Sequence, residues 1–334
     1  MRTIVKQPLL QEGGEAAQRR TLWSVLGQYG IQGVLVVLVV VLGLINSNFR
    51  QVSNLQSILT QASFAGIGAI GMTLIIIAGA FDLSVAGILA LCATAVAKIM
   101  PGAGVAPAIL AGLLLGVALG LVNGVVVTKA RIPAFITTLG MMYIYQAIDL
   151  MWTSGQVISI SNSQYQLLGT GTILGVPVPF LVMIGAYLVG FAILKVTTYG
   201  RYLRAIGSNE TAARVVGIPA DRMLIFAFAL VGLFTAIAGV LLAAELSSAN
   251  ATMATGFELN TIAVVVVGGT SLAGGQGTLF GSFTGALIFA VIYNAMDLFN
   301  VQSFWQYVAI GVVLILALGG ESARKRLLGT PTRT

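Results

Sequence analysis

The chain has 334 residues, of which 57% are hydrophobic and only 8% are charged, and this composition excludes a soluble globular protein. It holds one cysteine, Cys92, and no histidine, which excludes an intrachain disulfide framework, histidine metal sites and Ser-His-Asp triads. The net charge of +7 would suit nucleic acid. The basic residues instead flank apolar segments, as membrane topology requires, so no nucleic-acid partner is expected.

Ten apolar segments follow one another along the chain, and most have close to the roughly 20 residues that cross a bilayer. They lie at about 30–46, 56–78, 84–100, 108–128, 133–153, 178–196, 223–244, 260–273, 278–296 and 304–320. The eighth is short and ends in a glycine-rich turn at 271–277, so a re-entrant segment is the alternative there. The pattern predicts an all-α polytopic membrane protein with about ten transmembrane helices and broken or re-entrant segments.

The basic residues lie almost entirely on one side of these segments. With the amino terminus placed in the cytoplasm, fifteen of the 17 Lys and Arg residues fall inside, and only Arg50 and Lys98 fall outside. Cytoplasmic loops carry such an excess, so both termini are predicted to be cytoplasmic. The expected divisions are a cytoplasmic tail over 1–29 without a cleavable signal pattern, a transmembrane domain over 30–320 and a cytoplasmic tail over 321–334.

Two polar clusters that contain glycine interrupt the apolar segments, one at 79–84 and one at 268–273. Many transporters are built from repeats with broken helices at the binding site, and a chance resemblance of two glycine-rich turns is the alternative. In the first cluster, Asp82 lies between apolar stretches, where an ionisable group indicates a functional site. Its carboxylate can pair with a cation or a backbone turn, or it can cap the following helix.

Further polar residues lie within the apolar segments. Tyr143, Gln146 and Asp149 are expected to share one helix face near the outer end, where they can hydrogen-bond a polar solute or satisfy neighbouring helices. Asn123 lies near the inner end of the fourth segment, and helix–helix contact is the alternative to a ligand contact there. The predicted substrate path comprises Asp82, Asn123, Tyr143, Gln146, Asp149 and Asn294.

The most highly charged stretch in the interior of the chain is the loop 197–222, TTYGRYLRAIGSNETAARVVGIPADR. A short helix is predicted there, with Ser208 or Asn209 as its cap, Glu210 in its first turn and Arg214 in its last turn. A short cytoplasmic helix between two membrane spans suits the docking of another protein. A solvated loop that only sets topology is the alternative.

The sequence contains no GxxxxGK[ST] phosphate-binding loop, so the chain is not expected to bind ATP in the usual way. It also has no pair of carboxylates at helical spacing inside a span and no nucleophile elbow. We therefore expect no enzyme acting alone, and no metal or cofactor in this chain.

Four stretches of the chain are similar to a known family. They are GMTL with GAFDLSV (71–85), NG with IPAFITTLG (123–140), GRY with AIGSNE and ARVVGI (200–218), and GFEL with GGTSLAGGQG (256–277). On these stretches the chain resembles the permease subunits of bacterial ATP-driven (ABC) importers for simple sugars, most closely the ribose type, from about residue 48 to 319. The family usually has Gly-Gly-x-Asp-Leu-Ser-Val-Gly at the first turn, where this chain has Ala80 and Ala86.

The resemblance implies a multi-subunit importer in the bacterial inner membrane. The permease would pair with a second copy of itself or with a paralogous permease. A partner ATPase would bind the ATP, and a periplasmic binding protein would deliver the sugar. The helix in the loop 197–222 would then couple the permease to the ATPase, through Arg201, Arg204, Ser208, Asn209, Glu210, Arg214 and Gly217. Glu245 and Glu258, near the outer ends of spans, would belong to the docking surface for the binding protein.

The substrate that the resemblance predicts is a monosaccharide. Ribose is the first choice, and other pentoses, hexoses, a sugar alcohol or a furanone-type signal remain open. Permeases for branched-chain amino acids or nucleosides share the Asp-Leu-Ser and Gly-Gly patterns and are the alternative among ATP-driven importers. A secondary sugar transporter is the alternative outside them, although it would not need the charged loop 197–222.

Overall fold

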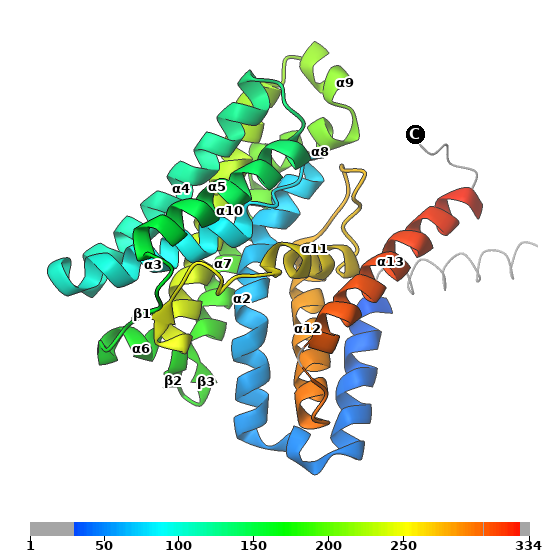
Figure 1. The fold of residues 1–334 in the computed structure, drawn as a ribbon. Coiled ribbons are helices and arrows are strands. Elements are labelled where there is room, and N and C mark those ends of the chain that lie inside the picture. Colours follow the sequence, from blue (N-terminus) through cyan, green and yellow to red (C-terminus); the bar gives the residue numbers. More distant parts are fainter. Residues whose placement is uncertain (1–29, 303, 328–334) are drawn as a thin grey trace, which may run out of the picture.

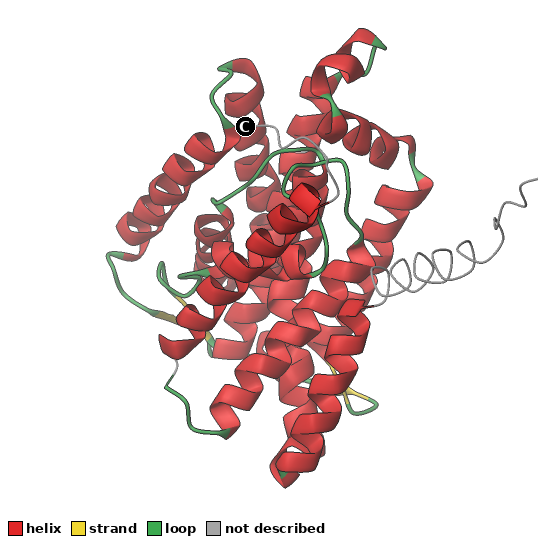
Figure 2. Ribbon diagram, turned by 90° about the vertical axis from the view of Figure 1, so that its right-hand side faces the viewer, coloured by secondary structure: helices red, strands yellow, loops and turns green. Residues whose placement is uncertain are grey.

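The computed structural model describes residues 30–302 and 304–327 (Figure 1). Helices make up most of this part of the chain, and its strands are each two residues long (Figure 2). The predicted all-α fold class is confirmed.

Seven helical segments within the described residues are long and apolar enough to cross a membrane. They are α2 (Val52–Ile77), α3 (Val85–Ala103), α4 (Val105–Lys129), α5 (Ala134–Thr153), the segment Val178–Val196, α10 (Ala220–Leu246) and α12 (Leu279–Leu298). The segment Val178–Val196 consists of α7 (Val178–Phe191) and a π-helical turn, η2 (Ala192–Val196). Three shorter apolar helices complete the ten expected segments: Gly30–Ile45, α11 (Phe257–Val267) and Phe304–Val313, which begins α13 (Phe304–Leu327).

The eighth segment is shorter in the structure than the sequence predicts. It is expected to reach residue 273, whereas α11 ends at Val267. Gly269 adopts a φ of 84°, which favours glycine, and its N–H donates to the carbonyl of Val266 at 2.9 Å. A loop over 268–278 then leads to α12.

The central helix of the molecule is α2. Every residue from 65 to 77 is buried, and the helix packs against α7, α10, α11 and α12. Small residues permit close approach, because a Cβ on Gly71 would lie 2.7 Å from the Cα of Val231 in α10. Helices in lipid are held together largely by such close packing.

Small elements connect the helices at one end of the molecule, which we call the β end. The connection after α5 holds β1 (Ile158–Ser159), α6 (Ser163–Thr170), β2 (Thr172–Ile173) and β3 (Val176–Pro177). β2 and β3 form a hairpin, and β1 pairs antiparallel with β4 (Ser248–Ala249), which follows α10. The connection 154–176 is therefore compact, and it ties the ends of α5 and α10 together.

The opposite end, which we call the α9 end, carries α8 (Thr198–Ser208) and α9 (Glu210–Val215) (Figure 1). The short helix predicted in the loop 197–222 is confirmed as α9. Its cap is Asn209, whose side-chain oxygen accepts from the N–H of Ala212 at 3.0 Å. The sequence did not predict α8, an amphipathic helix that buries Leu203 and Ile206.

The described chain enters and leaves at the α9 end. A Cβ on Gly269 would lie 3.4 Å from Ile31, at the start of the first described helix. α13 runs toward the same end (Figure 1). The predicted tail 1–29 and residues 328–334 lie outside the described residues, and α13 continues past 320 to Leu327.

Candidate functional site

Two helices end at the α9 end in turns of the same geometry. After α2, Gly79 has a φ of 85° and its N–H donates to the carbonyl of Ile76 at 2.9 Å. After α11, Gly269 and Val266 make the equivalent bond, and in both turns the following N–H bonds five residues back. We call residues 78–84 the first break and residues 268–278 the second break. The two interrupting clusters share one helix-ending motif, in which residue 79 corresponds to 269.

Gly207 of α8 lies between the two breaks. A Cβ on it would lie 1.9 Å from the carbonyl oxygen of Ile77 and 2.6 Å from the amide nitrogen of Gly275. That amide donates to the same carbonyl at 2.8 Å, and a Cβ on Gly79 would lie 3.5 Å from the Cα of Gly207. The three segments meet through backbone atoms, so a shift of α8 would displace both breaks.

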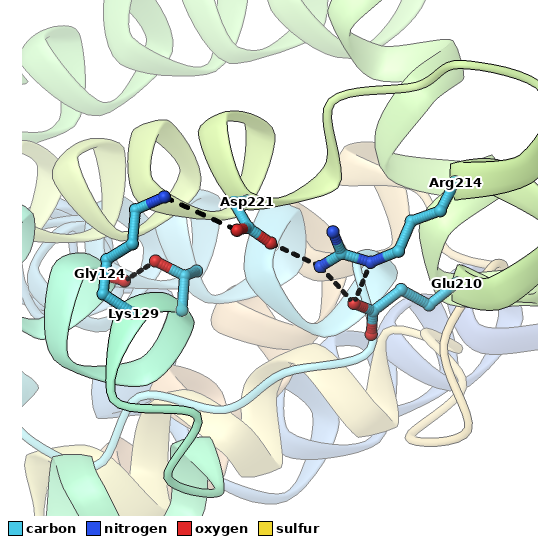
Figure 3. Close-up of polar contacts among 6 residues, drawn as sticks. Gly124, Lys129, Glu210, Arg214 and Asp221 are labelled. Carbon is cyan, nitrogen blue, oxygen red and sulfur yellow. Dashed lines mark hydrogen bonds and ion pairs between the residues drawn. The ribbon is translucent and has the colours of Figure 1, made fainter.

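A chain of ion pairs joins α9 to α10 and α4 (Figure 3). Arg214 donates to Oε1 of Glu210 at 2.8 Å and to Oδ1 of Asp221, near the start of α10. The other carboxylate oxygen of Asp221 lies 3.6 Å from Nζ of Lys129, the last residue of α4. The hydrogen bonds to Asp221 and Glu210 raise the pKa of the Arg214 guanidinium, so it stays charged. Because the groups are partly exposed, the ion pairs position α9 more than they stabilise the fold.

The other predicted coupling residues lie on the same two helices or at their ends. Arg204 donates to the carbonyl of Gly277 in the second break at 3.3 Å, and the Ser208 hydroxyl donates to the carbonyl of Arg204 at 2.8 Å. Arg201 is exposed on α8, and Gly217 follows α9 with a φ of 85°. We call α8 and α9 together the α8–α9 unit.

A cavity of about 560 Å³ lies between the α8–α9 unit and the first break. Its walls include Glu210, Arg214 and Asp221, together with residues 78–80 and the turn 131–134. Arg131 in this turn has a φ of 55°, a backbone conformation that residues other than glycine rarely adopt. The ion-pair network therefore borders an open space that reaches the first break.

Asp82 of the first break is fully buried in a polar network. Its Oδ1 accepts from the N–H of Ser84 at 2.9 Å and from the Ser84 hydroxyl at 2.6 Å. Asn123 of α4 donates to the Ser84 hydroxyl at 2.7 Å, and the Tyr145 hydroxyl of α5 lies 2.8 Å from Oδ1 of Asn123. The network fixes the start of α3 and ties the first break to α4 and α5.

Residues 54–318 match the family described as branched-chain amino acid transport system / permease component. The chain belongs to this permease family. The permease is 39% identical over 289 residues to the ribose import permease protein RbsC of Escherichia coli (strain K12), covering 85% of this chain and 90% of that protein. It is 38% identical to RbsC of Bacillus subtilis (strain 168), covering 85% and 89%. It is 35% identical over 311 residues to the L-arabinose ABC transporter permease protein AraH of Azospirillum brasilense, covering 93% and 92%.

No solved structure matches the permease. The family match and the apolar helices identify a multi-pass protein of the inner membrane. The resemblance read from the sequence motifs is confirmed.

The predicted path residues on α5 of the permease point in different directions. Tyr143 is 63% exposed, whereas Asp149 is fully buried and faces Thr94 of α3. The expectation that they share a face with Gln146 is wrong, because six residues turn a helix through about 240°. Gln146 is only partly buried.

The other predicted path residues lie in two further places. Asn294 of α12 donates to the side chain of Asn54 in α2 at 2.7 Å. Asp82 and Asn123 lie together in the buried network, where Nδ2 of Asn123 is 3.4 Å from Oδ2 of Asp82. The structure does not bring the six residues into one site, and their role in the path stays a prediction.

The two predicted docking residues lie at the β end. Glu245 lies in the last turn of α10, and a Cβ on Gly169 of α6 would lie 2.1 Å from its amide nitrogen. Glu258 lies in the first turn of α11. Both carboxylates are therefore at the end opposite the α8–α9 unit, and their docking role stays a prediction.

Sequence reasoning missed three residues of this site. Asp221 follows Arg214 by seven residues, and its acidic side chain at the start of a span among basic neighbours is a usable signal. From the sequence, Lys129 is expected only to set the membrane topology, because its partner Asp221 is 92 positions away in the chain. Gly207 has no signal in the sequence beyond being a glycine, since its neighbours come from two distant segments.

Proposed function

We propose that this permease is the membrane-spanning subunit of an ATP-driven importer for a monosaccharide, with ribose or another pentose as substrate. The observation that carries the proposal is similarity over 85% or more of the chain to permeases named for ribose and L-arabinose. The sugar would cross the membrane without any change in its bonds.

A separate subunit would bind and hydrolyse the ATP, because the sequence has no phosphate-binding loop. The excess of basic residues around the α8–α9 unit supports a cytoplasmic location for it. There it would contact the ATPase through Arg201, Arg204, Ser208, Asn209, Glu210, Arg214 and Gly217. The permease itself would be a transport subunit and not an enzyme.

The α8–α9 unit would pass movement of the ATPase to the two breaks. Gly207 supports this step, because it touches both breaks through backbone atoms. The ion pairs of Arg214 and Asp221 would keep α9 in register with α10 during the movement. Displacement of the breaks would then change the side from which the sugar path is open.

The β end would face the periplasm and receive the sugar-loaded binding protein. Glu245 at that end supports this placement, because a carboxylate there can pair with basic residues of a partner, whereas one carboxylate oxygen of Glu258 is buried. A second permease, identical or paralogous, would complete the path.

The test is to co-express the permease with candidate ATPase and binding-protein subunits from the same genome and to place the complex in lipid nanodiscs. ATP hydrolysis is then measured with ribose, L-arabinose and a branched-chain amino acid, since the family description names the last class. Stimulation by one sugar-loaded binding protein is the expected result. Stimulation by the amino acid alone would replace the substrate class, and failure to assemble would refute the proposal.

A second measurement separates the importer from a secondary sugar transporter. Uptake is followed in cells held at constant ATP while a protonophore collapses the proton gradient. Uptake by an ATP-driven importer should continue unchanged. Loss of uptake under these conditions would favour the secondary transporter.

A further inference from the structure

A small cavity lies at the β end between α11, α12 and α13. Its volume is about 210 Å³, and its walls include the side chains of Phe257, Asn260, Tyr293, Gln306 and Tyr307. Sites for drug-sized ligands have roughly 300–1,000 Å³, so this cavity suits one small ring. It lies outside the ion-pair network, the two breaks and the predicted path.

The side-chain carboxamides of Asn260 and Gln306 at this cavity each use only one of their two polar groups in a hydrogen bond within the described residues. Oδ1 of Asn260 accepts from the Tyr293 hydroxyl at 3.0 Å, which leaves the Asn260 amino group free among the described residues. Nε2 of Gln306 donates to Oδ1 of Asp297 at 3.1 Å, which leaves the Gln306 carbonyl oxygen free within the same range. The cavity therefore presents one oriented donor and one oriented acceptor, as a hydroxyl group requires.

Aromatic rings form much of the remaining wall, and no lining side chain is charged. Tyr307 is 57% exposed, and a Cβ on Gly256 would lie 3.0 Å from its ring, so the ring rests on the bare backbone there. A glycine suits this position, because its φ of 81° is a backbone conformation that residues with a side chain rarely adopt. A neutral cavity disfavours an amino acid, whose ammonium and carboxylate groups would lack partners.

We propose that this cavity receives a single monosaccharide ring during import. An apolar C–H face of the ring would pack on Tyr307, and ring hydroxyls would accept from Asn260 and donate to Gln306. The inference rests on the proposed function, because it supplies the place where the imported sugar contacts the permease.

A larger groove at the same end is the alternative location. It measures about 460 Å³ and is lined by Ser57, Thr60 and Gln61 of α2, with Phe64 and Glu245. It offers one aromatic ring and a carboxylate, whereas the smaller cavity offers three rings and no charge. The chemistry of a neutral sugar ring favours the smaller cavity.

The first experiment measures sugar uptake by proteoliposomes that contain the permease, its ATPase and its binding protein. Asn260→Leu and Gln306→Leu should each lower the uptake efficiency about three- to tenfold, the effect of one lost hydrogen bond. Tyr307→Ala should lower it while Tyr307→Phe should not, because the ring and not the hydroxyl makes the contact. The control is Gln61→Leu in the alternative groove, which should transport normally.

Two failures are distinguishable in this assay. If the wild-type complex imports no sugar, the proposed function falls and the cavity assignment falls with it. If the wild type imports sugar and all cavity variants match it, only the cavity assignment is overturned. Assembly with the ATPase, checked by size-exclusion chromatography, identifies any variant that fails to fold.

The second experiment modifies a cysteine introduced at the cavity. The single native cysteine, Cys92, is buried, so the introduced thiol is the one that the reagent is expected to reach. A membrane-impermeant thiol reagent is added from the side of the binding protein to Gln306→Cys and, as control, to Ser57→Cys. Modification of Gln306→Cys should block uptake, whereas modified Ser57→Cys should still transport. Unblocked uptake by a fully modified Gln306→Cys, or a block only in Ser57→Cys, would overturn the assignment.

Discussion

The first and second breaks begin with the same helix-ending turn, yet they are held in different ways. In the first break, buried side chains fix the chain: Asp82 holds Ser84, and Thr138 of α5 accepts from the N–H of Leu83 at 3.0 Å. In the second break, backbone contacts set the path, and glycines at 269, 274 and 275 all have positive φ. Side-chain networks resist displacement, whereas a glycine loop with exposed residues deforms easily. The difference indicates that the first break is rigid and that the second break can deform.

The largest effect is expected at the contact that joins the two breaks. Gly207→Ala places a Cβ 1.9 Å from the carbonyl oxygen of Ile77, and backbone cannot yield as a flexible side chain can. We expect the free energy of unfolding to fall by about 3 kcal/mol, at the upper end for overpacking. Thermal unfolding of the purified protein measures it. Gly185→Ala in α7, where nothing lies within 4 Å, is the matched control and should be neutral.

A smaller loss of stability is expected when only the first break is altered. Asp82→Ala removes the acceptor of the buried Ser84 and Asn123 donors, which should lower the free energy of unfolding by about 2 kcal/mol. In the second break, the exposed side chain of Gln276 is expected to be replaceable by alanine at a cost below about 0.5 kcal/mol. The same unfolding assay compares them. Equal losses would show that the two breaks are held equally firmly.

A small effect on stability, but a large effect on coupling, is expected at the ion pairs. Arg214→Gln and Asp221→Asn should each lower the free energy of unfolding by less than about 1 kcal/mol, because the pair is partly exposed. If α9 transmits movement, both variants should hydrolyse ATP in the assembled complex with less sugar imported for each ATP. Arg222→Gln is the control, since no ion pair joins Arg222 to the described residues. A normal amount of sugar imported for each ATP in both variants would show that the ion-pair network does not help to transmit movement.

The apolar segments and their order along the chain were predictable from the sequence, because a bilayer imposes length and hydropathy on each span. The cap at Asn209 was predictable too, since a helix start depends on local residue types. The contacts of Gly207 and the pairing of Lys129 with Asp221 were not, because they join segments that are distant in the chain. The six-residue spacing of Tyr143 and Asp149 by itself places them on different faces of α5. Which of the two faces the core was not predictable, because hydropathy does not distinguish the buried face from the exposed face of a uniformly apolar span.

The central position of α2 has a consequence for biosynthesis. α2 is among the first helices to leave the ribosome, but several of the helices that enclose it, α10, α11 and α12, are made much later. Asn54 pairs with Asn294, and the Thr73 hydroxyl lies 2.7 Å from that of Ser282, across 240 and 209 positions. Until α12 is inserted, these polar groups of α2 have no helix to meet. A nascent chain that stops before α12 would therefore carry an incomplete core, in which Asn54 and Thr73 keep only their local partners, the carbonyls of Phe49 and Ala69.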